Sequence, residues 1–280
     1  MWMRSVLLAG LALGLLPGAG WASADEQAPA PGADRPRIGL VLSGGGARGA
    51  AHIGVIRALE RRHVPIDAVA GTSMGAVVGG LYAAGLSGNE IAEVFRTLDW
   101  QDLLRDRAPR KDLVYRRKQD DRSFLASGGL GVRADDGFVL ALGRVQGQKV
   151  TQGLRNATMA VADVQDFDRL PTPFRALATD LETGDAVVLR SGDLATVLRA
   201  SMSAPGVLAP VEIGGQLLVD GGLVNNLPVD LVKEMGVDVV IAVDVSFPLS
   251  RRDGLATPLD VSNKMIGIMV RRGTAASLRE

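Results

Sequence analysis

Hydrophobic and polar residues form short apolar runs, each followed by a stripe at helical spacing. The run IGLVLS (38–43) is continuous and bounded by glycines, which predicts a strand buried on both faces. GGGARG follows, and AAHIGVIRALERR then carries an apolar stripe typical of a helix. IDAVAG (66–71) predicts a second strand, and MGAVVGGLYAAG a second helix built from small residues. Strand, glycine turn and helix, repeated twice, indicate a parallel sheet.

The rest of the chain continues this alternation after one polar interruption. Residues 102–122 hold scattered apolar positions and predict an irregular, exposed segment. Ser87 and Glu90 have the spacing of a capping box at the start of a helix. Asp193 is the expected N-cap of a later helix, and Pro228 stands at another helix start. The further expected elements are, in chain order, a helix over 146–161, a strand pair turning at 182–185, a strand ending at QLLVDGG, a strand over 237–246 and a helix over 261–280.

This order predicts one α/β domain in which a mostly parallel central sheet is flanked by helices on both faces. The domain is expected over residues 37–250, with a linker and helix at 251–280. Aromatic residues make up only 4% of the chain, and 35 residues are glycine. This composition fits buried strands packed under small-residue helices.

The first 24 residues have the features of a secretory signal peptide. They contain Arg4, an apolar run over 6–16, and small residues Ala22 and Ala24 before the expected cleavage point. The run is shorter than the roughly 20 residues that span a bilayer, so cleavage is favoured over an uncleaved anchor. Export to the periplasm, the outer membrane or the exterior is expected. Residues 25–36 are rich in Pro, Ala and acids and predict a flexible leader.

Composition and charge exclude further classes. The sequence has no cysteine, which excludes disulfides and a lipidated N-terminal cysteine. It has 31 basic and 31 acidic residues, and residues 1–24 contain one Arg and no acid, so the exported chain has a formal charge of −1. Nucleic-acid binders carry strongly basic surfaces, so nucleic acid is not an expected partner.

Three glycines between the first strand and its helix, Gly44, Gly46 and Gly49, match the dinucleotide-binding pattern G-x-G-x-x-G. Such a site also needs an acidic residue at the end of the second strand, but the nearest acid, Asp67, stands at its beginning. A phosphate-binding Walker loop fails because no lysine follows the glycines. What remains is a helix N-terminus rich in backbone N–H groups, which can bind an anion, including the oxyanion of a transition state.

GTSMG (71–75) is a Gly-x-Ser-x-Gly pentapeptide between a buried strand and a small-residue helix. In hydrolases this turn presents a nucleophilic serine, here Ser73, to the positive end of a helix dipole. The N–H of Met74 is expected to point towards an oxyanion. The alternative is a serine that only closes a buried turn, because the pentapeptide also arises by chance.

The two histidines, His52 and His63, both precede Ser73, which disagrees with the Ser, acid, His order of α/β-hydrolases. His52 lies on the helix after the glycine loop beside Ile53, where a structural role is favoured. His63 lies in a turn and is expected to be solvated. A Ser-His-Asp triad is therefore not expected.

Asp220 is the preferred base for the serine. It stands at the carboxyl end of the apolar strand LLVD, before Gly221 and Gly222, and ligands bind at that edge of open parallel sheets. The alternative is an aspartate that only shapes the turn with these glycines. A carboxylate with a pKa near 4 is a weak base for a hydroxyl. Asp220 therefore needs partial desolvation, and the developing alkoxide needs the helix dipole and the loop amides.

SGGGARG (43–49), GTSMG (71–75) and DGG (220–222), in this order and each at a strand end, resemble the three signatures of the patatin-like phospholipases. The resemblance covers residues 37–250, including ASMSAPG (200–206) and NNLP (225–228). It implies a three-layer α/β/α serine lipid acyl hydrolase with a Ser-Asp dyad and no metal or organic cofactor. It also implies a phospholipid or lysophospholipid substrate at a membrane surface. By position, the resemblance makes Ser73 the nucleophile and Asp220 its base. It implies oxyanion donors at Gly44, Gly45, Gly46 and Met74. The positions that it implies support the motifs are Arg48, Gly49, Gly71, Gly75, Gly221 and Gly222.

Several alternatives stay open at this point. The leader and DLVYRRKQDDR resemble secreted bacterial members whose catalytic domain precedes an outer-membrane barrel, so the chain is expected to be a shorter relative or truncated in its last helix. Residues 105–122 hold eight cations and four acids and predict a solvated loop, or else a mobile segment that approaches anionic lipid. A catalytically silent lipid-binding or assembly module and a Rossmann-type nucleotide-binding enzyme are the competing functions. The oligomeric state, a homodimer included, is open.

Overall fold

The computed structural model describes residues 35–105, 114–116, 130–133, 137–140, 145–246 and 258–279. The expected signal peptide, nearly all of the leader and most of the polar segment 102–122 lie outside these residues. Those interpretations therefore stay predictions. The elements below all belong to one unit, which begins at Pro36.

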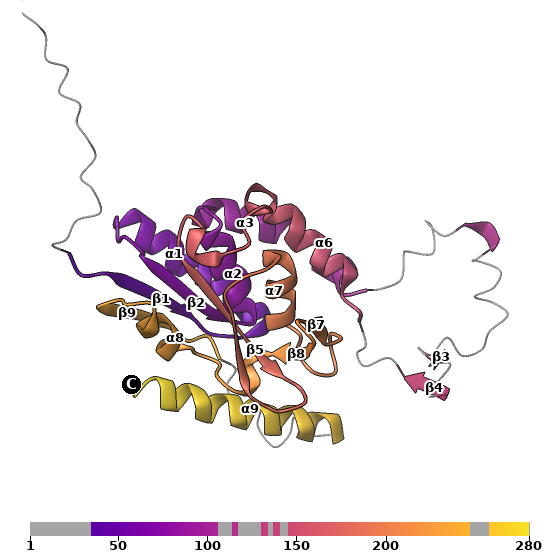
Figure 1. The fold of residues 1–280 in the computed structure, drawn as a ribbon. Coiled ribbons are helices and arrows are strands. Elements are labelled where there is room, and N and C mark those ends of the chain that lie inside the picture. Colours follow the sequence, from indigo (N-terminus) through magenta and orange to yellow (C-terminus); the bar gives the residue numbers. More distant parts are fainter. Residues whose placement is uncertain are drawn as a thin grey trace, which may run out of the picture. The chain divides into compact units, whose positions relative to one another are not determined.

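A seven-stranded mixed sheet forms the centre of this unit (Figure 1). Its strands are β1 (Ile38–Leu42), β2 (Ala68–Thr72), β5 (Phe174–Asp180), β6 (Ala186–Leu189), β7 (Val211–Ile213), β8 (Gln216–Asp220) and β9 (Val239–Val243). The main path runs β7-β8-β5-β2-β1-β9, and β6 pairs with β5 beside it. Neighbours along β9, β1, β2 and β5 are parallel, whereas β6 and β8 run antiparallel to β5.

The strand β5 is longer than its parallel neighbour β2 and extends past the end of that strand. Thr72, the last residue of β2, lies opposite Leu177 of β5. The next three residues of β5 pair with β8, and Asp220 lies opposite Ala178 there. The ends of β2 and β8 therefore meet on either side of the same part of β5.

Helices cover both faces of the sheet (Figure 1). The helices of the first face, whose buried side chains share a core with Leu40 and Leu42, are α1 (Ala51–Arg61), α2 (Met74–Ala83), α3 (Gly88–Thr97), α6 (Gln148–Ala157) and α7 (Leu194–Ser201). A short helix, α4 (Trp100–Leu103), follows α3. On the other face, α8 (Val229–Glu234) packs against Val41 and Leu177. The predicted α/β class, with a mostly parallel sheet between helices, is confirmed.

The last helix, α9 (Pro258–Ser277), lies on the α8 side of the sheet (Figure 1). It contacts η5 (Gly221–Leu223), a single 3-10 turn directly after β8. Hydrogen bonds from its buried side join α9 to the loop between η5 and α8. The predicted C-terminal helix is confirmed, and it lies close to the end of β8.

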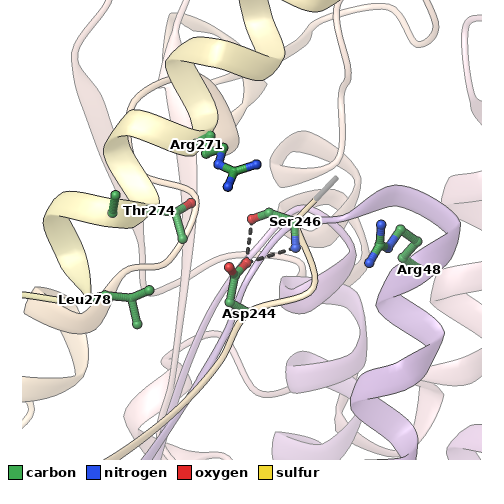
Figure 2. Close-up of a pocket in the computed structure, with 7 residues that line it drawn as sticks. Arg48, Asp244, Ser246, Arg271, Thr274 and Leu278 are labelled. Carbon is green, nitrogen blue, oxygen red and sulfur yellow. Dashed lines mark hydrogen bonds between the residues drawn. The ribbon is translucent and has the colours of Figure 1, made fainter. Parts of the chain in front are cut away.

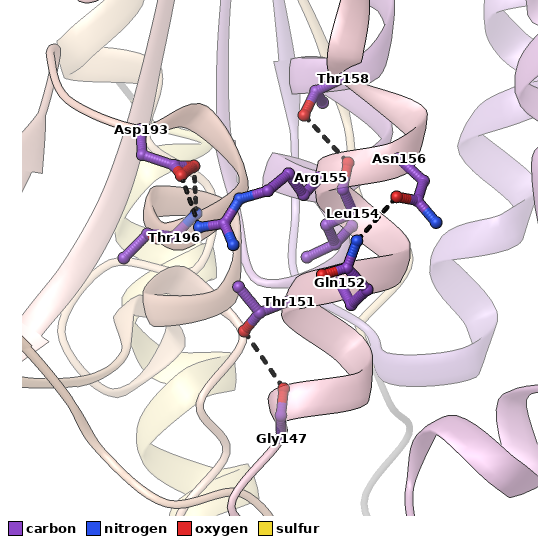
Figure 3. A network of polar contacts seen from close by, with 9 residues as sticks. All are labelled: Gly147, Thr151, Gln152, Leu154, Arg155, Asn156, Thr158, Asp193 and Thr196. Carbon is purple, nitrogen blue, oxygen red and sulfur yellow. Dashed lines mark hydrogen bonds and ion pairs between the residues drawn. The ribbon is translucent and has the colours of Figure 1, made fainter. Parts of the chain in front are cut away.

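The sequence signals for helix starts are confirmed. Ser87 and Glu90 form a complete capping box on α3. Asp193 accepts a hydrogen bond from the backbone N–H of Thr196 and so caps α7. Its other carboxylate oxygen pairs with Arg155 of α6 at 2.8 Å (Figure 3). The Asp193 side chain thus provides an acceptor for a free N–H group at the start of α7 and also joins α7 to α6.

The elements predicted from the hydrophobic pattern differ from the observed elements mainly where the observed elements are short. The glycine loop ends in a 3-10 helix, η1 (Gly46–Ala50), stacked on the start of α1, where the sequence predicts only a loop. The pattern also does not predict β7 or the antiparallel pair of β3 (Leu130–Arg133) and β4 (Gly137–Leu140). Runs of three or four residues are too short to show a period.

Candidate active site

Ser73 lies in the turn between β2 and α2 with a strained backbone. Its φ of 55° and ψ of −124° fall in a region that side-chain-bearing residues rarely adopt. This turn puts the hydroxyl at the N-terminus of α2, where the helix dipole favours negative charge. The backbone N–H of Ser73 donates to the Ser201 hydroxyl at 2.9 Å, and that hydroxyl donates to the Leu177 carbonyl at 2.6 Å. Ser201 therefore holds the strained turn in place, a role for which the sequence offers only the ASMSAPG resemblance.

The two glycines of the pentapeptide let backbone segments approach closely around Ser73. A Cβ at Gly75 would lie 2.2 Å from the Leu42 carbonyl oxygen and 2.5 Å from that of Ser43. A Cβ at Gly71 would lie 2.6 Å from the Gly75 carbonyl oxygen. Neither backbone contact can relax as a side chain would. The spacing G-x-S-x-G is therefore required by packing between β1, β2 and α2.

Asp220 is brought to Ser73 by the end of β8. The Ser73 hydroxyl donates to Oδ2 of Asp220 at 2.6 Å, and the backbone N–H of Gly222 donates to Oδ1 at 2.8 Å. The main chain of Asp220 is fixed as well, because its N–H donates to the Ser203 carbonyl and its carbonyl accepts from the Thr179 hydroxyl. Burial raises the pKa of Asp220 to about 6, and the two hydrogen bonds oppose that rise.

The glycine loop lies beside Ser73, but its amides are not equivalent. The N–H groups of Gly45, Gly46 and Met74 have no hydrogen-bond acceptor in the described structure. The N–H of Gly44, in contrast, donates to the Asn226 carbonyl at 3.1 Å. The expectation that Gly44 is an oxyanion donor is therefore corrected, because that donor is already in use. Gly44 instead provides space, since a Cβ there would lie 3.1 Å from Cβ of Ser73.

The remaining motif positions support this arrangement. A Cβ at Gly49 would lie 2.3 Å from Cγ of Met74, so Gly49 lets η1 pack on the turn after the serine. A Cβ at Gly221 would lie 2.3 Å from the Leu177 carbonyl oxygen, and Gly222 supplies the amide bonded to Asp220. Arg48 is exposed on η1, and its backbone N–H donates to the Gly45 carbonyl.

Asn226 is a site residue that the sequence did not single out. Its carbonyl accepts from the Gly44 N–H, and its side-chain amide donates to the Gly44 carbonyl at 3.4 Å. The same amide donates to the hydroxyls of Ser246, at 2.9 Å, and Thr274, at 3.4 Å. Asn226 is buried. It therefore joins the glycine loop to the loop after Asp220, to the end of β9 and to α9.

The histidines take the positions expected of non-catalytic residues. His52 is fully buried, and its Nε2 donates to the Ser43 carbonyl at 2.8 Å. Burial lowers the pKa of His52, and its Nδ1 has no partner in the described structure. His63 is exposed in the turn after α1. A dinucleotide site would need an acidic residue at the far end of β2. Asp67 instead lies directly before the first residue of β2, and its carboxylate accepts a hydrogen bond from the Ile38 N–H.

A pocket of about 390 Å³ opens between the glycine-loop helix η1 and α9 (Figure 2). It is lined by Arg48, Asp244, Ser246, Arg271, Thr274, Ala275 and Leu278. Two cations and one carboxylate thus line a space on the α9 side of the loop. Within the described parts of the chain, no three His, Asp or Glu side chains come together in a way that could hold a metal ion. None of the helices in those parts is both long and apolar enough to cross a bilayer.

Comparisons with known proteins indicate the family. The family model described as patatin-like phospholipase matches residues 40–233. An uncharacterized NTE family protein of Mycobacterium tuberculosis is 36% identical over 215 residues, which is 77% of this chain and 51% of that protein. Lysophospholipase NTE1 of Pyricularia oryzae is 36% identical over 208 residues, which is 74% of this chain and 12% of that protein. The chain thus spans about half, or less, of the curated relatives it matches.

Among solved structures, VipD from Legionella pneumophila matches part of this chain. The TM-score is 0.44 and the sequence identity 17%, over 69% of this chain and 47% of that chain.

Proposed function

The chain belongs to the patatin-like phospholipase family, and on that premise we propose that it is a serine lipid acyl hydrolase. Its substrates are carboxylic esters of phospholipids or lysophospholipids, and the reaction passes through an acyl-serine intermediate. The observation that supports this proposal best is the 2.6 Å hydrogen bond from the Ser73 hydroxyl to the Asp220 carboxylate, close to the N–H groups of Gly45, Gly46 and Met74, which have no acceptor in the described structure. Nucleophile, base and charge-stabilising donors thus lie in one place.

In the proposed acylation step, Asp220 takes the proton of the Ser73 hydroxyl while Oγ attacks the ester carbonyl carbon. The carbonyl oxygen becomes an oxyanion held by the N–H groups of Gly45, Gly46 and Met74, with the dipole of α2 behind them. Collapse breaks the bond to the glyceryl oxygen, and Asp220 returns the proton to that leaving group. A raised pKa suits this exchange, because an acid and base near the working pH transfers protons best.

In the proposed deacylation step, Asp220 is ionised again and takes a proton from a water molecule. The resulting hydroxide attacks the acyl carbonyl, and the same three amides hold the second oxyanion. The bond to Oγ of Ser73 breaks, Asp220 reprotonates the serine, and a fatty acid leaves. No metal or organic cofactor enters either step of the proposal.

The first experiment labels the purified protein with a fluorophosphonate probe, which reacts with an activated serine. Wild type should react and Ser73→Ala should not, and mass spectrometry of phospholipid products should show free fatty acid from wild type alone. Asp220→Asn should fold and lose about 10²- to 10⁴-fold in kcat, the usual contribution of a general base. An unreactive, folded wild-type protein would instead support a silent lipid-binding or assembly module.

The compartment is part of the same proposal. The pattern of residues 1–24 supports export, and a lipid hydrolase acting on membrane lipids from outside the cytoplasm is consistent with it. Immunoblotting of periplasmic and culture fractions from cells that express the full chain tests this. Full-length protein retained in the cytoplasmic fraction would contradict export.

A further inference from the structure

The C-terminal helix α9 exposes three large apolar side chains on one side. Met265, Ile268 and Met269, at helical spacing on one side, are 61%, 38% and 57% exposed. The opposite side, which packs on the loop after η5, carries the half-buried Ile266 and Val270 together with Thr274 and Ser277, both buried and hydrogen-bonded. A helix of a globular domain normally exposes polar residues on the side away from the core. The apolar side of α9 is therefore suited to contact an apolar partner.

Cations stand beside this apolar stripe. Arg271, Arg272 and Arg279 are exposed in the C-terminal half of α9 and the turn after it. The sequence has no acidic residue between positions 264 and 279. An apolar stripe beside exposed cations is complementary to an anionic lipid surface. The apolar side chains enter the boundary between headgroups and acyl chains, and the guanidinium groups approach the lipid phosphates.

The inner side of α9 is close to the proposed catalytic residues. Ser277 donates to the side chain of Asn225, and Thr274 bonds to Asn226, the residue that holds Gly44. Arg271 also lines the pocket shared with Arg48 of η1 (Figure 2). A surface bound to the outer side of α9 would thus be separated from the glycine loop by about the width of one helix.

We propose that the outer face of α9 docks on an anionic phospholipid membrane. This outer face is defined as Met265, Ile268, Met269, Arg272 and Arg279. The inference rests on the proposed function, since it names the surface from which the hydrolase takes its substrate. Docking itself requires no chemistry, so the two can be tested apart.

The test uses the full chain carrying Ser73→Ala, so that vesicles are not degraded, in flotation with phosphatidylcholine vesicles with and without phosphatidylglycerol. Binding should be stronger to the anionic vesicles and should weaken with salt. Replacing Arg272 and Arg279 by Gln should weaken it by about 25-fold, from about fivefold per cation. Gln at the three apolar positions should weaken binding to both vesicle types. Gln keeps helix propensity, so the helix is retained.

Matched control variants distinguish binding through the outer face from nonspecific binding of vesicles to other exposed methionines and cations. Met159→Gln removes an exposed methionine on η3 (Met159–Val161), and the pair Arg61→Gln and Arg62→Gln removes exposed cations at the end of α1. Both controls should bind vesicles like the parent. Equal binding by the outer-face variants and the controls would overturn the proposal. So would a dimer that the apolar variant dissociates, because the occupant of the face is then a second copy.

The esterase activity of otherwise wild-type protein keeps the two proposals distinct. With a soluble short-chain ester, the outer-face variants should keep the wild-type kcat. Vesicle binding without any ester hydrolysis would sink the proposed function and leave the docking face standing. Ester hydrolysis together with vesicle binding that does not depend on the outer face would support the proposed function and contradict the docking face.

Discussion

Ser73 donates its hydroxyl hydrogen bond to Oδ2 of Asp220, a residue 147 positions later in the chain, at 2.6 Å. The second oxygen of that carboxylate is held by the Gly222 amide, so the carboxylate is fixed with one oxygen facing the serine. Burial outweighs both hydrogen bonds and raises the pKa of Asp220 to about 6. The state of one proton on Asp220 thus determines whether the proposed base is available.

We expect kcat/KM for a soluble ester to fall about tenfold per pH unit below about pH 6. The physical reason is that only ionised Asp220 can accept the serine proton, and its pKa is about 6. The pH–rate profile of the purified enzyme measures this directly. A profile that stays flat down to about pH 4.5 would contradict a base with this pKa.

The same pKa predicts that Asp220→Asn stabilises the fold at alkaline pH. Folded Asp220 keeps its proton up to about pH 6, whereas an unfolded chain releases it near pH 4. The folded state binds more protons between these values, so this group lowers the free energy of unfolding as pH rises through the interval. Asp220→Asn should therefore gain up to about 3 kcal/mol at pH 8 and little at pH 4.

Urea unfolding of both proteins at the two pH values measures this gain. The comparison needs the difference between wild type and variant at each pH, because other groups titrate in both proteins. A variant that is equally destabilised at pH 4 and pH 8 would show that Asp220 is not a buried charge.

Gly75→Ala should unfold the protein or cost about 3 kcal/mol or more, because the new Cβ meets backbone that cannot move aside. Its matched control is Gly54→Ala in α1, where a Cβ meets nothing within 4 Å. That control should stabilise by about 0.5–1 kcal/mol through helix propensity. Urea unfolding of the two variants decides the matter. Similar free energies of unfolding in both would mean that the turn tolerates a side chain at Gly75.

Asn226→Ala should lower kcat by about 10- to 100-fold with little change in KM, because it removes the side-chain amide that donates to the Gly44 carbonyl and to Ser246, which loosens the loop carrying the amides of Gly45 and Gly46. The backbone bond from the Gly44 N–H to the Asn226 carbonyl stays in this variant. Thr274→Val removes the 3.4 Å contact to the Asn226 amide and the Thr274 bond to the Val270 carbonyl, and should have a smaller effect. Steady-state kinetics on a soluble ester, with the pH profile, measures both. A purely structural role would appear as lost stability with an unchanged kcat. The pKa seen in the profile should stay the same, since Asp220 is untouched.

His52→Gln and His63→Asn should each keep fluorophosphonate labelling and ester hydrolysis. Gln can still donate to the Ser43 carbonyl that His52 bonds, and Asn tolerates the positive φ of 52° at His63. Circular dichroism establishes that the variants fold. Loss of hydrolysis in a folded variant would reopen the search for the base.

The sheet and most helices could be predicted because their signals are local. Continuous apolar runs gave β1, β2 and β9, and capping side chains such as Asp193 marked helix starts. The direction of β8 could not be predicted, because nothing in a single strand's sequence specifies its neighbour. Asp220 was placed at the site by a rule for parallel strands. It reaches Ser73 on an antiparallel strand, because β5 extends past the end of β2 and pairs with β8 there.

Within the site, the signatures indicated the residues but not how their backbone groups are paired. The glycine loop suggested three amide donors and the serine turn a fourth, and only the fold reveals that the carbonyl of Asn226, 182 positions away, accepts from the N–H of Gly44. Ser201 and Asn226 act through hydrogen bonds between segments that are far apart in the sequence. A buried serine or asparagine has no periodic signature, so such contacts need the three-dimensional structure.

The separation of Ser73 and Asp220 along the chain also sets when the proposed activity can begin. Chains are made from the N-terminus, and the strained serine turn is synthesised long before β8. A nascent chain that ends before Asp220 holds the nucleophile without its base, so on the proposed mechanism it is inactive towards the membranes around it. The site becomes competent only when β8 has paired with the end of β5, so on the proposed mechanism hydrolysis begins after every strand of the sheet except β9 has been synthesised.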